Sequence, residues 1–419
     1  MQNCFDFAVI GGGAAGLFAA CQLNRLGVSE NADVTLIEKN NIPGKKLTLT
    51  GHGRCNITNR KEVSRLKEGY HEASNFIYPA LMEFGPEDTV SFFENVIGLK
   101  VKEEDNNRIF PVSDSAVKVR DALVSYISDC SKIVCGAEVS SISIKDGFEV
   151  TTSKGQYHFD QLILSCGGSS FRETGSSGDS YRFAGSLGHT VIPVRAALAP
   201  VNADDGSLGF CRALSGVSLD ADISLYCEGK KTASMSGAVL FAGFGLTGPS
   251  VMEISREVPS DIDGKDVYLE LDLVPGTSDE EFDRRLIDLI GGHPDTKIAT
   301  LLSGFIPQSA ASAITERTGC EGLYAQGFPK DNRKKICRAM KHLRIGLKGA
   351  PDLNAAYVTR GGVSLKEVDR KTMESRRVPG LYIIGEALDI DGISGGYNLQ
   401  ACMSEAYLAA KAILSKKIC

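Results

Sequence analysis

Hydrophobic and polar positions change their spacing twice within the first 40 residues. An apolar run from Phe5 to Ile10 ends in glycines, and apolar residues at helical spacing follow over 14–23. A second apolar stretch, "DVTLIEKN", ends in Glu38 and its polar neighbours. The pattern predicts a strand, a helix and a second strand within about 30 residues, which is how a parallel sheet begins.

The middle of the first 190 residues mixes helical and strand-like spacing. The segment "KVKEEDNNRIFP" indicates a hairpin, and "SDSAVKVRDALVSYISDC" indicates a helix with Ser113 as its N-cap. Strand-like runs from Ile133 to Gly168 alternate with turns at Asp146-Gly147 and Lys154-Gly155. All of this fits one α/β domain.

The pattern changes near 190 and again near 350. Strand-like runs continue to about 275, helices follow from an N-cap at Ser278, and strand and helix return after 350. We therefore predict an α/β domain built from 1–190 and 351–419. We predict an insertion over 191–350, with its helices at about 276–335.

Composition is that of a soluble protein. The 419 residues predict two or three domains, and no apolar run approaches the roughly 20 residues of a membrane span. The start lacks a secretory pattern, so a cytoplasmic protein is expected. A net charge of −6 gives no signature for nucleic acid or an anionic membrane, which leaves a small-molecule substrate as the expected partner. The sequence indicates no oligomeric state.

Glycines at 11, 13 and 16 stand between the first strand and the helix. Gly11 suits the tight turn, Gly13 lets the backbone approach a pyrophosphate, and Gly16 allows close helix–strand packing. Glu38, 22 residues beyond Gly16, can accept hydrogen bonds from a ribose. This combination predicts dinucleotide binding.

The last 40 residues favour a flavin over a nicotinamide dinucleotide. Gly385-Glu386 follows the strand "LYII" and places a carboxylate where ligands bind in such sheets. "GISGGYNLQ" then opens a helix whose first amides, near Asn398 and Leu399, would favour an anionic reduced ring.

The segment "GHGRCNITN" from Gly51 to Asn59 admits three interpretations: a metal site, a cysteine nucleophile, or a cradle for a polar cofactor. His52 and Cys55 supply only two metal ligands, so no metal is predicted. Cys55 would need a base to act as a nucleophile. The twelve cysteines contain no C-x-x-C pair, and even Cys130 and Cys135 are expected to be buried free thiols.

The chain resembles the bacterial aminoacetone oxidase-like, or BaiN-like, flavoproteins. The resemblance rests on "VIGGGAAGL", "EKNNIPGKKLTLTGHGRCNITN", "LILSCGGSS", "TGSSGDSY", "FGLTGPSVM" and "KTMESRRVPGLYIIGEALDIDGISGGYNLQ". It implies non-covalent FAD in a glutathione-reductase-like Rossmann domain, with an inserted β-rich domain that carries a small helical subdomain.

The resemblance also implies a set of cofactor-binding residues. They are Gly11, Gly13, Ala15, Gly16, Glu38, Lys39, Gly44, Lys45, Gly51, Gly53, Arg54, Cys55, Asn56, Val139, Gly167, Gly168, Gly385, Glu386, Asp391, Gly392, Gly396, Tyr397, Asn398 and Leu399. The sequence departs from the family pattern at Gly243, where relatives often carry a histidine, and at Arg360.

We predict an FAD-dependent oxidoreductase that transfers hydride between a small organic substrate and flavin N5. His52, Arg54, Arg360 and Tyr397 are candidates for catalytic residues. Alternatives are an NAD(P)H-dependent reductase of an unsaturated, steroid-like acid, a non-catalytic flavin-binding redox sensor, and, against the acidic charge, a nucleic-acid-modifying flavoenzyme. A second glycine pattern, at 243, 245 and 248, is expected to be a loop of the insertion rather than an NAD(P)H site.

Overall fold

The computed structural model describes residues 6–27 and 33–417, so the predicted strand residue Phe5 lies outside the described residues. The chain forms two compact units. Unit 1 contains the residues up to Arg195 and those from Val358 onward, and unit 2 is Ala196–Tyr357. The predicted insertion, 191–350, begins five residues before the start of unit 2 and ends seven residues before the end of unit 2.

The two connections between the units explain this offset. Strand β11 (Val191–Ala197) pairs with β18 (Val358–Val363) in a two-stranded sheet. At Gly361 the two backbones are so close that a Cβ would lie 2.4 Å from the carbonyl oxygen of Pro193. Because the strands pair with each other, most of both belongs to unit 1.

A five-stranded parallel sheet in the order β19–β10–β1–β2–β6 forms the core of unit 1. Its strands are β1 (Phe7–Ile10), β2 (Val34–Ile37), β6 (Lys132–Val134), β10 (Gln161–Leu164) and β19 (Leu381–Ile383). Every residue of β1 and β2 is buried, which is typical of parallel sheets with both faces covered.

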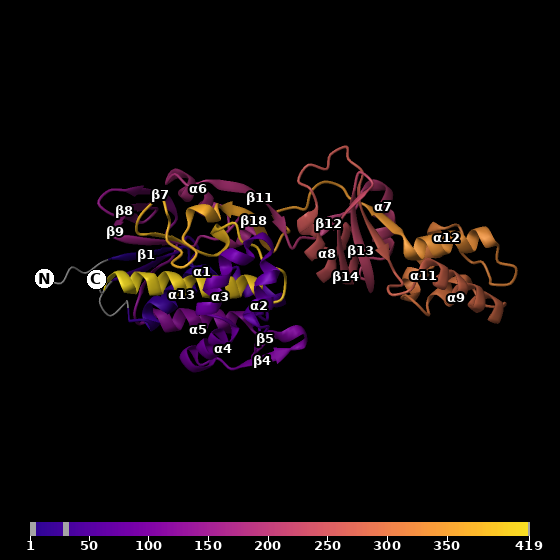
Figure 1. Cartoon of the computed structure of the whole chain (residues 1–419), viewed down its shortest axis with the longest axis horizontal. Helices are drawn as coiled ribbons and strands as arrows, with labels where there is room; N and C mark the ends of the chain where they lie inside the picture. Colours follow the sequence, from indigo (N-terminus) through magenta and orange to yellow (C-terminus); the bar gives the residue numbers. More distant parts are fainter. Residues whose placement is uncertain (1–5, 28–32, 418–419) are drawn as a thin grey trace. The chain divides into compact units, whose positions relative to one another are not determined.

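Helices from opposite ends of the chain pack together in unit 1. The expected first helix is α1 (Ala14–Arg25), and it lies against α13 (Tyr397–Lys417) (Figure 1). The other helices are α2 (Val63–Leu66), α3 (Ser74–Glu83), α4 (Pro86–Ser91), α5 (Ala116–Ser128) and α6 (Asp179–Ser186). The two ends of the sequence therefore build one core.

Two small antiparallel sheets complete unit 1. The first contains β3 (Thr58–Asn59), β4 (Val101–Glu104) and β5 (Arg108–Pro111), and β4 and β5 form the predicted hairpin. The second contains β7 (Val139–Ile144), β8 (Phe148–Thr152) and β9 (Gly155–Phe159).

The predicted N-cap at Ser113 is wrong. Helix α5 begins two residues later, and the Ser115 hydroxyl accepts from the Lys118 amide at 3.3 Å. The chain first turns at Asp114, whose φ is +47° and whose N–H donates to the Pro111 carbonyl. The cap at Ser278 is confirmed, because its hydroxyl accepts from the Glu281 amide at 3.2 Å.

Unit 2 is built on a six-stranded antiparallel sheet in the order β12–β15–β14–β13–β16–β17. Its strands are β12 (Val201–Asn202), β13 (Ser218–Cys227), β14 (Lys230–Ala242), β15 (Gly245–Thr247), β16 (Val267–Asp272) and β17 (Leu343–Gly346). Its helices are α7 (Asp205–Ala213), α8 (Pro249–Ile254), α9 (Asp279–Gly292), α10 (Ile298–Leu302), α11 (Gln308–Arg317) and α12 (Lys330–Lys341).

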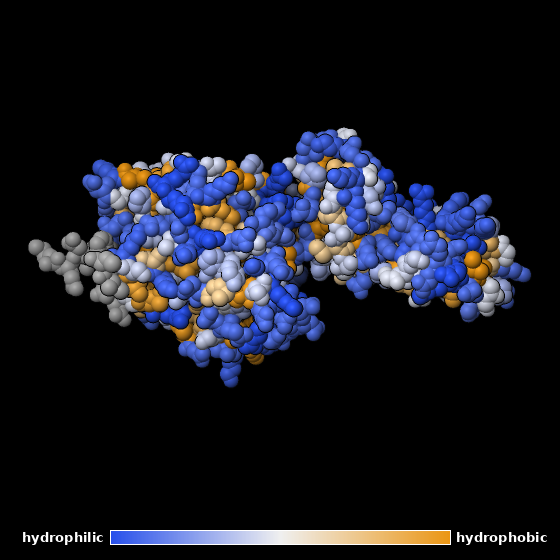
Figure 2. Space-filling model, in the orientation of Figure 1, coloured by the Kyte–Doolittle hydropathy of each residue, from blue (hydrophilic) through white to orange (hydrophobic). Residues whose placement is uncertain are grey.

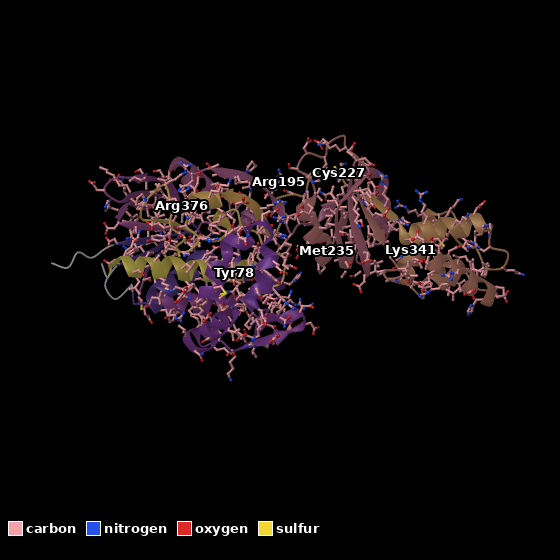
Figure 3. The ribbon with its side chains drawn as sticks, in the orientation of Figure 1. Tyr78, Arg195, Cys227, Met235, Lys341 and Arg376 are labelled. Atoms are coloured by element: carbon pink, nitrogen blue, oxygen red, sulfur yellow. The ribbon has the colours of Figure 1, made fainter. Side chains whose placement is uncertain are left out.

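Within unit 2, α9 to α12 form a helical subdomain beside the sheet (Figure 1). Lys341, at the end of α12, is buried where this subdomain meets the sheet, and its ammonium pairs with Asp272 of β16 at 2.5 Å (Figure 3). Within residues 6–27 and 33–417, none of the helices combines the length and the hydrophobicity needed to cross a bilayer.

Candidate functional site

The candidate site lies where the parallel strands of unit 1 end. Strands β1, β2, β10 and β19 run in the same direction, so the loops that follow them meet at one edge of the sheet. Those loops begin at Gly11, Glu38, Ser165 and Ile384. Polar groups that are far apart in the sequence therefore converge at this edge.

The three glycines of the first loop have different surroundings. A Cβ at Gly11 would lie 2.6 Å from the Cα of Cys166, and one at Gly16 would lie 1.9 Å from the Gly11 carbonyl oxygen. Gly13, the N-cap of α1, has no heavy atom within 4 Å of its Cβ position. Gly11 and Gly16 are thus required for packing, whereas Gly13 borders open space at a helix N-terminus that attracts anions.

Glu38 is buried at the end of β2 and is held by backbone amides. One carboxylate oxygen accepts from the Gly12 N–H at 2.7 Å, and the other accepts from the Asn40 N–H at 2.7 Å. The carboxylate therefore has a fixed position beside the glycine loop at 11–13.

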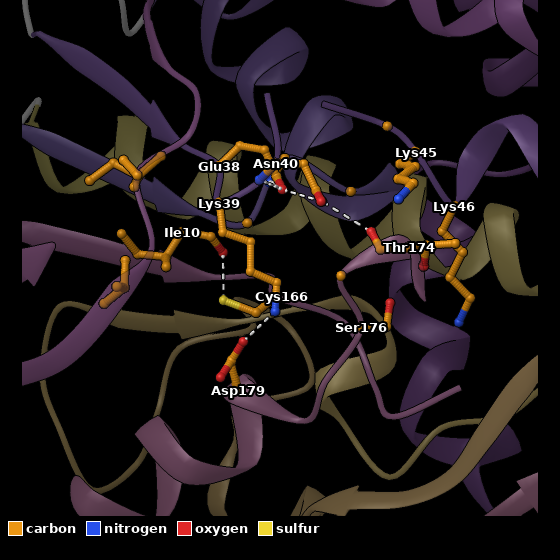
Figure 4. Close-up of a pocket in the computed structure, with 18 of the residues that line it drawn as sticks. Ile10, Glu38, Lys39, Asn40, Lys45, Lys46, Cys166, Thr174, Ser176 and Asp179 are labelled. Atoms are coloured by element: carbon orange, nitrogen blue, oxygen red, sulfur yellow. Dashed lines mark hydrogen bonds and ion pairs between the residues drawn. The ribbon is translucent and has the colours of Figure 1, made fainter. Parts of the chain in front are cut away.

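A polar segment after β10 closes the same pocket, as Figure 4 shows. The Lys39 ammonium pairs with Asp179 at 2.7 Å, and the Asn40 amide donates to the Thr174 carbonyl at 3.0 Å. These contacts tie the end of β2 to the start of α6, where Asp179 is the first helical residue.

Lys45 and Lys46 are adjacent in sequence and differ in environment. Lys45 donates to the Glu173 carbonyl at 2.6 Å and is exposed. Lys46 points inward, where its ammonium pairs with Glu386 at 2.8 Å and donates to Ser170 at 2.6 Å. Only Lys46 contacts the carboxylate at the end of β19.

Glu386 is a half-buried anion of the site. It also accepts from the Ser170 hydroxyl at 2.8 Å and from the Thr359 N–H at 2.6 Å. Burial alone would raise the pKa of Glu386, but the Lys46 charge and these hydrogen bonds lower it below its ordinary value. Glu386 is therefore ionised at neutral pH.

The pocket at this edge contains seven of the predicted cofactor residues. They are Gly11, Gly13, Glu38, Lys39, Gly44, Lys45 and Val139. The prediction omitted Gly12, Asn40, Lys46, Ala137, Cys166, Thr174, Ser176, Asp179 and Phe183, which also line it. Ala15, Gly167 and Gly168 lie beside the phosphate loop or the end of β10 and are outside this lining.

The "GHGRCNITN" segment meets the turn that precedes α13. A Cβ at Gly396 would lie 2.4 Å from the carbonyl carbon of Thr58, and the Asn59 amide donates to the Gly395 carbonyl at 3.2 Å. The Asn56 side-chain amide donates to the Thr58 and Ile109 carbonyls, and in this orientation its oxygen accepts from the Gly396 N–H at 3.1 Å. Two motifs 340 positions apart thus form one structural element.

Asn398 holds the other side of this turn. Its side-chain oxygen accepts from the Gly392 N–H at 2.8 Å, and its side-chain nitrogen donates to the Gly392 carbonyl at 2.8 Å. Asp391 and Leu399 are buried on either side of this clamp. The first amides of α13 then point along the helix axis out of its N-terminus.

Arg54 is engaged by carboxylates of the β4–β5 region. Its guanidinium pairs with Glu104 and, at 2.6 Å, with Asp114, and it lies over the Phe110 ring at 4.2 Å from the centroid. These partners raise the pKa of Arg54. A contact between Arg54 and a phosphate or a substrate carboxylate would have to compete with both acids.

The surroundings of Cys55 do not suit a nucleophile. The side chain is buried, and burial raises the pKa of the thiol to about 12. His52 is exposed in a left-handed backbone conformation, with φ +56°, between Gly51 and Gly53. The ten cysteines within the described residues are free thiols. Cys130 is exposed and Cys135 is half-buried, so the expectation that these two thiols are buried is wrong.

Arg360 and Tyr397 have partners in unit 1. Arg360 pairs with Glu72 at 3.3 Å. The buried Tyr397 ring packs against Tyr70, and its hydroxyl accepts from the Lys61 ammonium at 3.1 Å. Of the four candidates, Tyr397 and His52 carry groups that can give up a proton during a reaction.

A buried carboxyl lies beneath this edge of the sheet. Glu405 of α13 accepts from the Gly385 N–H at 2.5 Å. Burial raises the pKa of Glu405 to about 8, although that hydrogen bond lowers it. The described residues contain no group of three or more His, Cys, Asp or Glu side chains arranged to hold a metal ion.

The profile of the family described as "HI0933-like protein Rossmann domain" matches residues 5–412. The chain belongs to the HI0933-like family. The expected family and the expected Rossmann-type α/β fold are confirmed by this match. Within the family, the predicted enzyme class, an oxidoreductase, is also confirmed.

Relatives in this family are similar over their whole length. The chain is 31% identical to 3-dehydro-bile acid delta(4,6)-reductase of Clostridium scindens, covering 96% of this chain and 98% of that protein. It is also 31% identical to ribosomal RNA dihydrouridine synthase of Haemophilus influenzae, with 99% of each chain covered. In fold it is similar to 3-ketosteroid delta1-dehydrogenase of Sterolibacterium denitrificans, with a TM-score of 0.50, 13% identity, and coverage of 99% and 100%.

The residues of unit 1 fit FAD, the cofactor that membership of the HI0933-like family supports. The open space at Gly13 suits a pyrophosphate, and Glu38 is placed for a ribose. The lining continues to Lys46, which pairs with the half-buried Glu386. Hydrogen-bond donors and acceptors therefore follow one another along the pocket, as an elongated ligand such as FAD requires.

Proposed function

We propose that this protein is an FAD-dependent reductase of a carbon–carbon double bond conjugated to a carbonyl group. The observation that carries the proposal is a chemical feature shared by two relatives with different substrates. A 3-dehydro-bile acid with double bonds at positions 4 and 6 is a conjugated ketone. The uracil of RNA that becomes dihydrouridine also has its double bond next to a carbonyl.

The reaction adds two electrons and two protons to the substrate, as one hydride and one proton. The β-carbon of the double bond receives a hydride, and the α-carbon receives a proton. When bound and reduced, the flavin of FAD would supply the hydride from its N5 atom. A nicotinamide dinucleotide, NADH or NADPH, is the proposed reductant that restores the cofactor.

The residues of unit 1 have separate proposed roles. The amides around Gly13 bind the pyrophosphate, and Glu38 binds the ribose. The ammonium of Lys46 and the carboxylate of Glu386 lie beside the flavin end of the cofactor in this proposal. The N-terminus of α13 stabilises negative charge that develops near Asn398.

The proton requires a donor or water. Tyr397, whose hydroxyl is positioned by Lys61, and His52 are the proposed candidates. Arg54 and Arg360 are held in ion pairs, so their proposed contribution is positive charge.

A reoxidation experiment under anaerobic conditions tests the proposal. The purified holoprotein is reduced with NADPH or NADH and mixed with a 3-oxo-4,6-diene steroid acid or with ribosomal RNA that lacks dihydrouridine. The flavin absorbance should return, and the product should gain two mass units. The saturated steroid and dihydrouridine-containing RNA are the matched controls. Rapid reduction of the cofactor by amines, with no reoxidation by either conjugated compound, would show that it is an oxidase instead.

A further inference from the structure

The inference concerns the exposed face of α12 in unit 2 and rests on the proposed function. The twelve residues of α12 include six Lys and Arg and a single acid, Asp331. Unit 2 as a whole is acidic, with 17 Lys and Arg against 22 Asp and Glu. Positive charge is therefore concentrated on this helix within a negative unit.

Two of the six cations are used to hold the helix in place. Arg333 forms a bidentate pair with Asp283 of α9, at 2.7 and 3.2 Å. The buried Lys341 pairs with Asp272 and donates to the Val274 carbonyl at 3.1 Å. Ile336 and Met340 are fully buried on the same inner side.

The other four cations lie on the outer side of the helix. All are exposed, and none makes an ion pair or a side-chain hydrogen bond to the part of the chain that the structure describes: Lys330, Lys334, Lys335 and Arg338. Lys330, Lys334 and Arg338 follow one another at intervals of four residues, which places them along one stripe. The stripe is about 12 Å long, enough to contact more than one phosphate of an extended backbone.

Three acids of the neighbouring helix α9 already have partners. On α9, Asp283 pairs with Arg333, Glu281 pairs with Arg285, and Asp279 accepts from His342 at 2.9 Å. The surface where Figure 1 places α12 is accordingly strongly hydrophilic in Figure 2. The cations of the outer face retain their charge for a partner.

An aromatic ring precedes this face. Tyr324, in the loop that leads to α12, is 51% exposed, and the Lys297 ammonium lies 5.9 Å from its ring centroid. Exposed rings flanked by cations are stacking platforms for unpaired bases. The helical subdomain thus carries both a row of cations and an exposed aromatic ring. This combination matches the phosphates and bases of a nucleic-acid strand better than it matches a lipid surface.

We propose that the outer face of α12, together with Tyr324, binds the backbone and an unpaired base of RNA. This face would bring an RNA substrate to the enzyme and would distinguish RNA from small conjugated ketones. A chain with a net charge of −6 could bind RNA in this way. Four clustered cations attract a phosphate backbone at short range, whereas acids more than a screening length away repel it only weakly.

The test compares two pairs of adjacent exposed lysines in unit 2. The holoprotein variant Lys334→Gln/Lys335→Gln carries the change in α12. Lys230→Gln/Lys231→Gln is the matched control, at the start of β14. Binding to a labelled RNA stem-loop with unpaired uridines is measured by fluorescence anisotropy over a range of KCl concentrations.

The α12 pair should weaken RNA binding roughly tenfold or more near 0.1 M salt and reduce the slope of log K against log salt by about 1.4. Adding Arg338→Gln should reduce that slope by about a further 0.7. Lys334→Arg/Lys335→Arg should restore binding, and the control pair should bind as the unchanged protein does.

Three results would overturn the inference. In the first, the unchanged protein binds no RNA, and in the second, the α12 variant and the control variant lose RNA affinity equally. In the third, the α12 variant binds phosphatidylserine vesicles less tightly than the unchanged protein and binds RNA equally well. A separate readout distinguishes failure of the proposed function. The rate at which the steroid dienone reoxidises the reduced holoprotein should be the same in the α12 variant and the unchanged protein. If the unchanged protein reduces no conjugated compound, the proposed function is wrong, and that result does not bear on RNA binding by α12.

Discussion

Two segments of the chain carry the same glycine spacing and build different structures. Gly11 and Gly13 connect a parallel strand to the twelve-residue helix α1, and Gly16 lies in the first turn of that helix. The second pattern, at 243, 245 and 248, connects the antiparallel strands β14 and β15 and precedes the six-residue helix α8. Only the first pattern produces a helix N-terminus at the carboxyl edge of a parallel sheet.

The middle glycines show the difference most clearly. The Cβ position of Gly13 faces open space, whereas that of Gly245 lies 2.3 Å from the Val201 carbonyl oxygen of β12. One glycine leaves room for a ligand, and the other allows two strands to approach. A glycine motif therefore indicates a nucleotide site only together with the strand and helix that flank it.

The largest expected effect comes from Gly13→Val. Its backbone, with φ −72°, accepts a side chain, so the variant should fold. The valine would occupy the space proposed for the pyrophosphate, and we expect FAD binding to weaken by roughly two orders of magnitude, about 3 kcal/mol. Flavin absorbance per protein after purification and titration with FAD measure the change.

Gly245→Val is the matching variant in the second pattern. A side chain there meets the backbone of β12, so the melting temperature should fall while folded protein keeps its flavin. Loss of flavin in both variants to the same degree would remove the distinction between the two patterns.

A smaller effect is expected from Glu38→Ala. The change removes the acceptor proposed for the adenosine ribose and the partner of the Gly12 N–H. FAD binding should weaken about tenfold, since a charged hydrogen bond contributes roughly 1.5–3 kcal/mol. FMN, which has no adenosine, should bind about as before. Isothermal titration of the apoprotein with each cofactor measures both, and equal losses would refute the ribose role.

A pH-dependent effect on stability, rather than on cofactor binding, is expected at Glu405. Its folded pKa of about 8 lies above the ordinary carboxyl value of 4.5. Its contribution to stability is complete below about pH 4.5 and is lost as the pH rises toward 8. Relative to the unchanged protein, Glu405→Gln should therefore gain unfolding free energy by roughly 1.4 kcal/mol per pH unit in this window. Urea unfolding at pH 5, 6, 7 and 8 measures it, and a constant difference would contradict the assignment.

The sequence was a good guide to elements whose signal is local. The spacing of apolar residues predicted β1, α1 and β2, and the cap at Ser278 followed from the acids after it. The cap of α5 was misplaced because the positive φ of Asp114 delays the helix, and a serine stands on each side of that residue.

Site residues were missed where the deciding information is three-dimensional. Lys45 and Lys46 are chemically identical in sequence, and only their directions in the fold distinguish them. Thr174 and Asp179 belong to a recognised motif, but their role in closing the pocket depends on contacts with Lys39 and Asn40. Net charge was similarly uninformative about α12, because a sum over the chain cannot reveal where cations cluster.

The pairing of β11 with β18 has an evolutionary consequence. Because the chain leaves unit 1 and returns to it through neighbouring strands, unit 2 is topologically a long loop between two adjacent points. Residues 196–357 can then change in sequence or length without altering the strands of unit 1 that carry the loops of the candidate site. Such modularity is a structural route by which one lineage could supply reductases for both bile acids and ribosomal RNA.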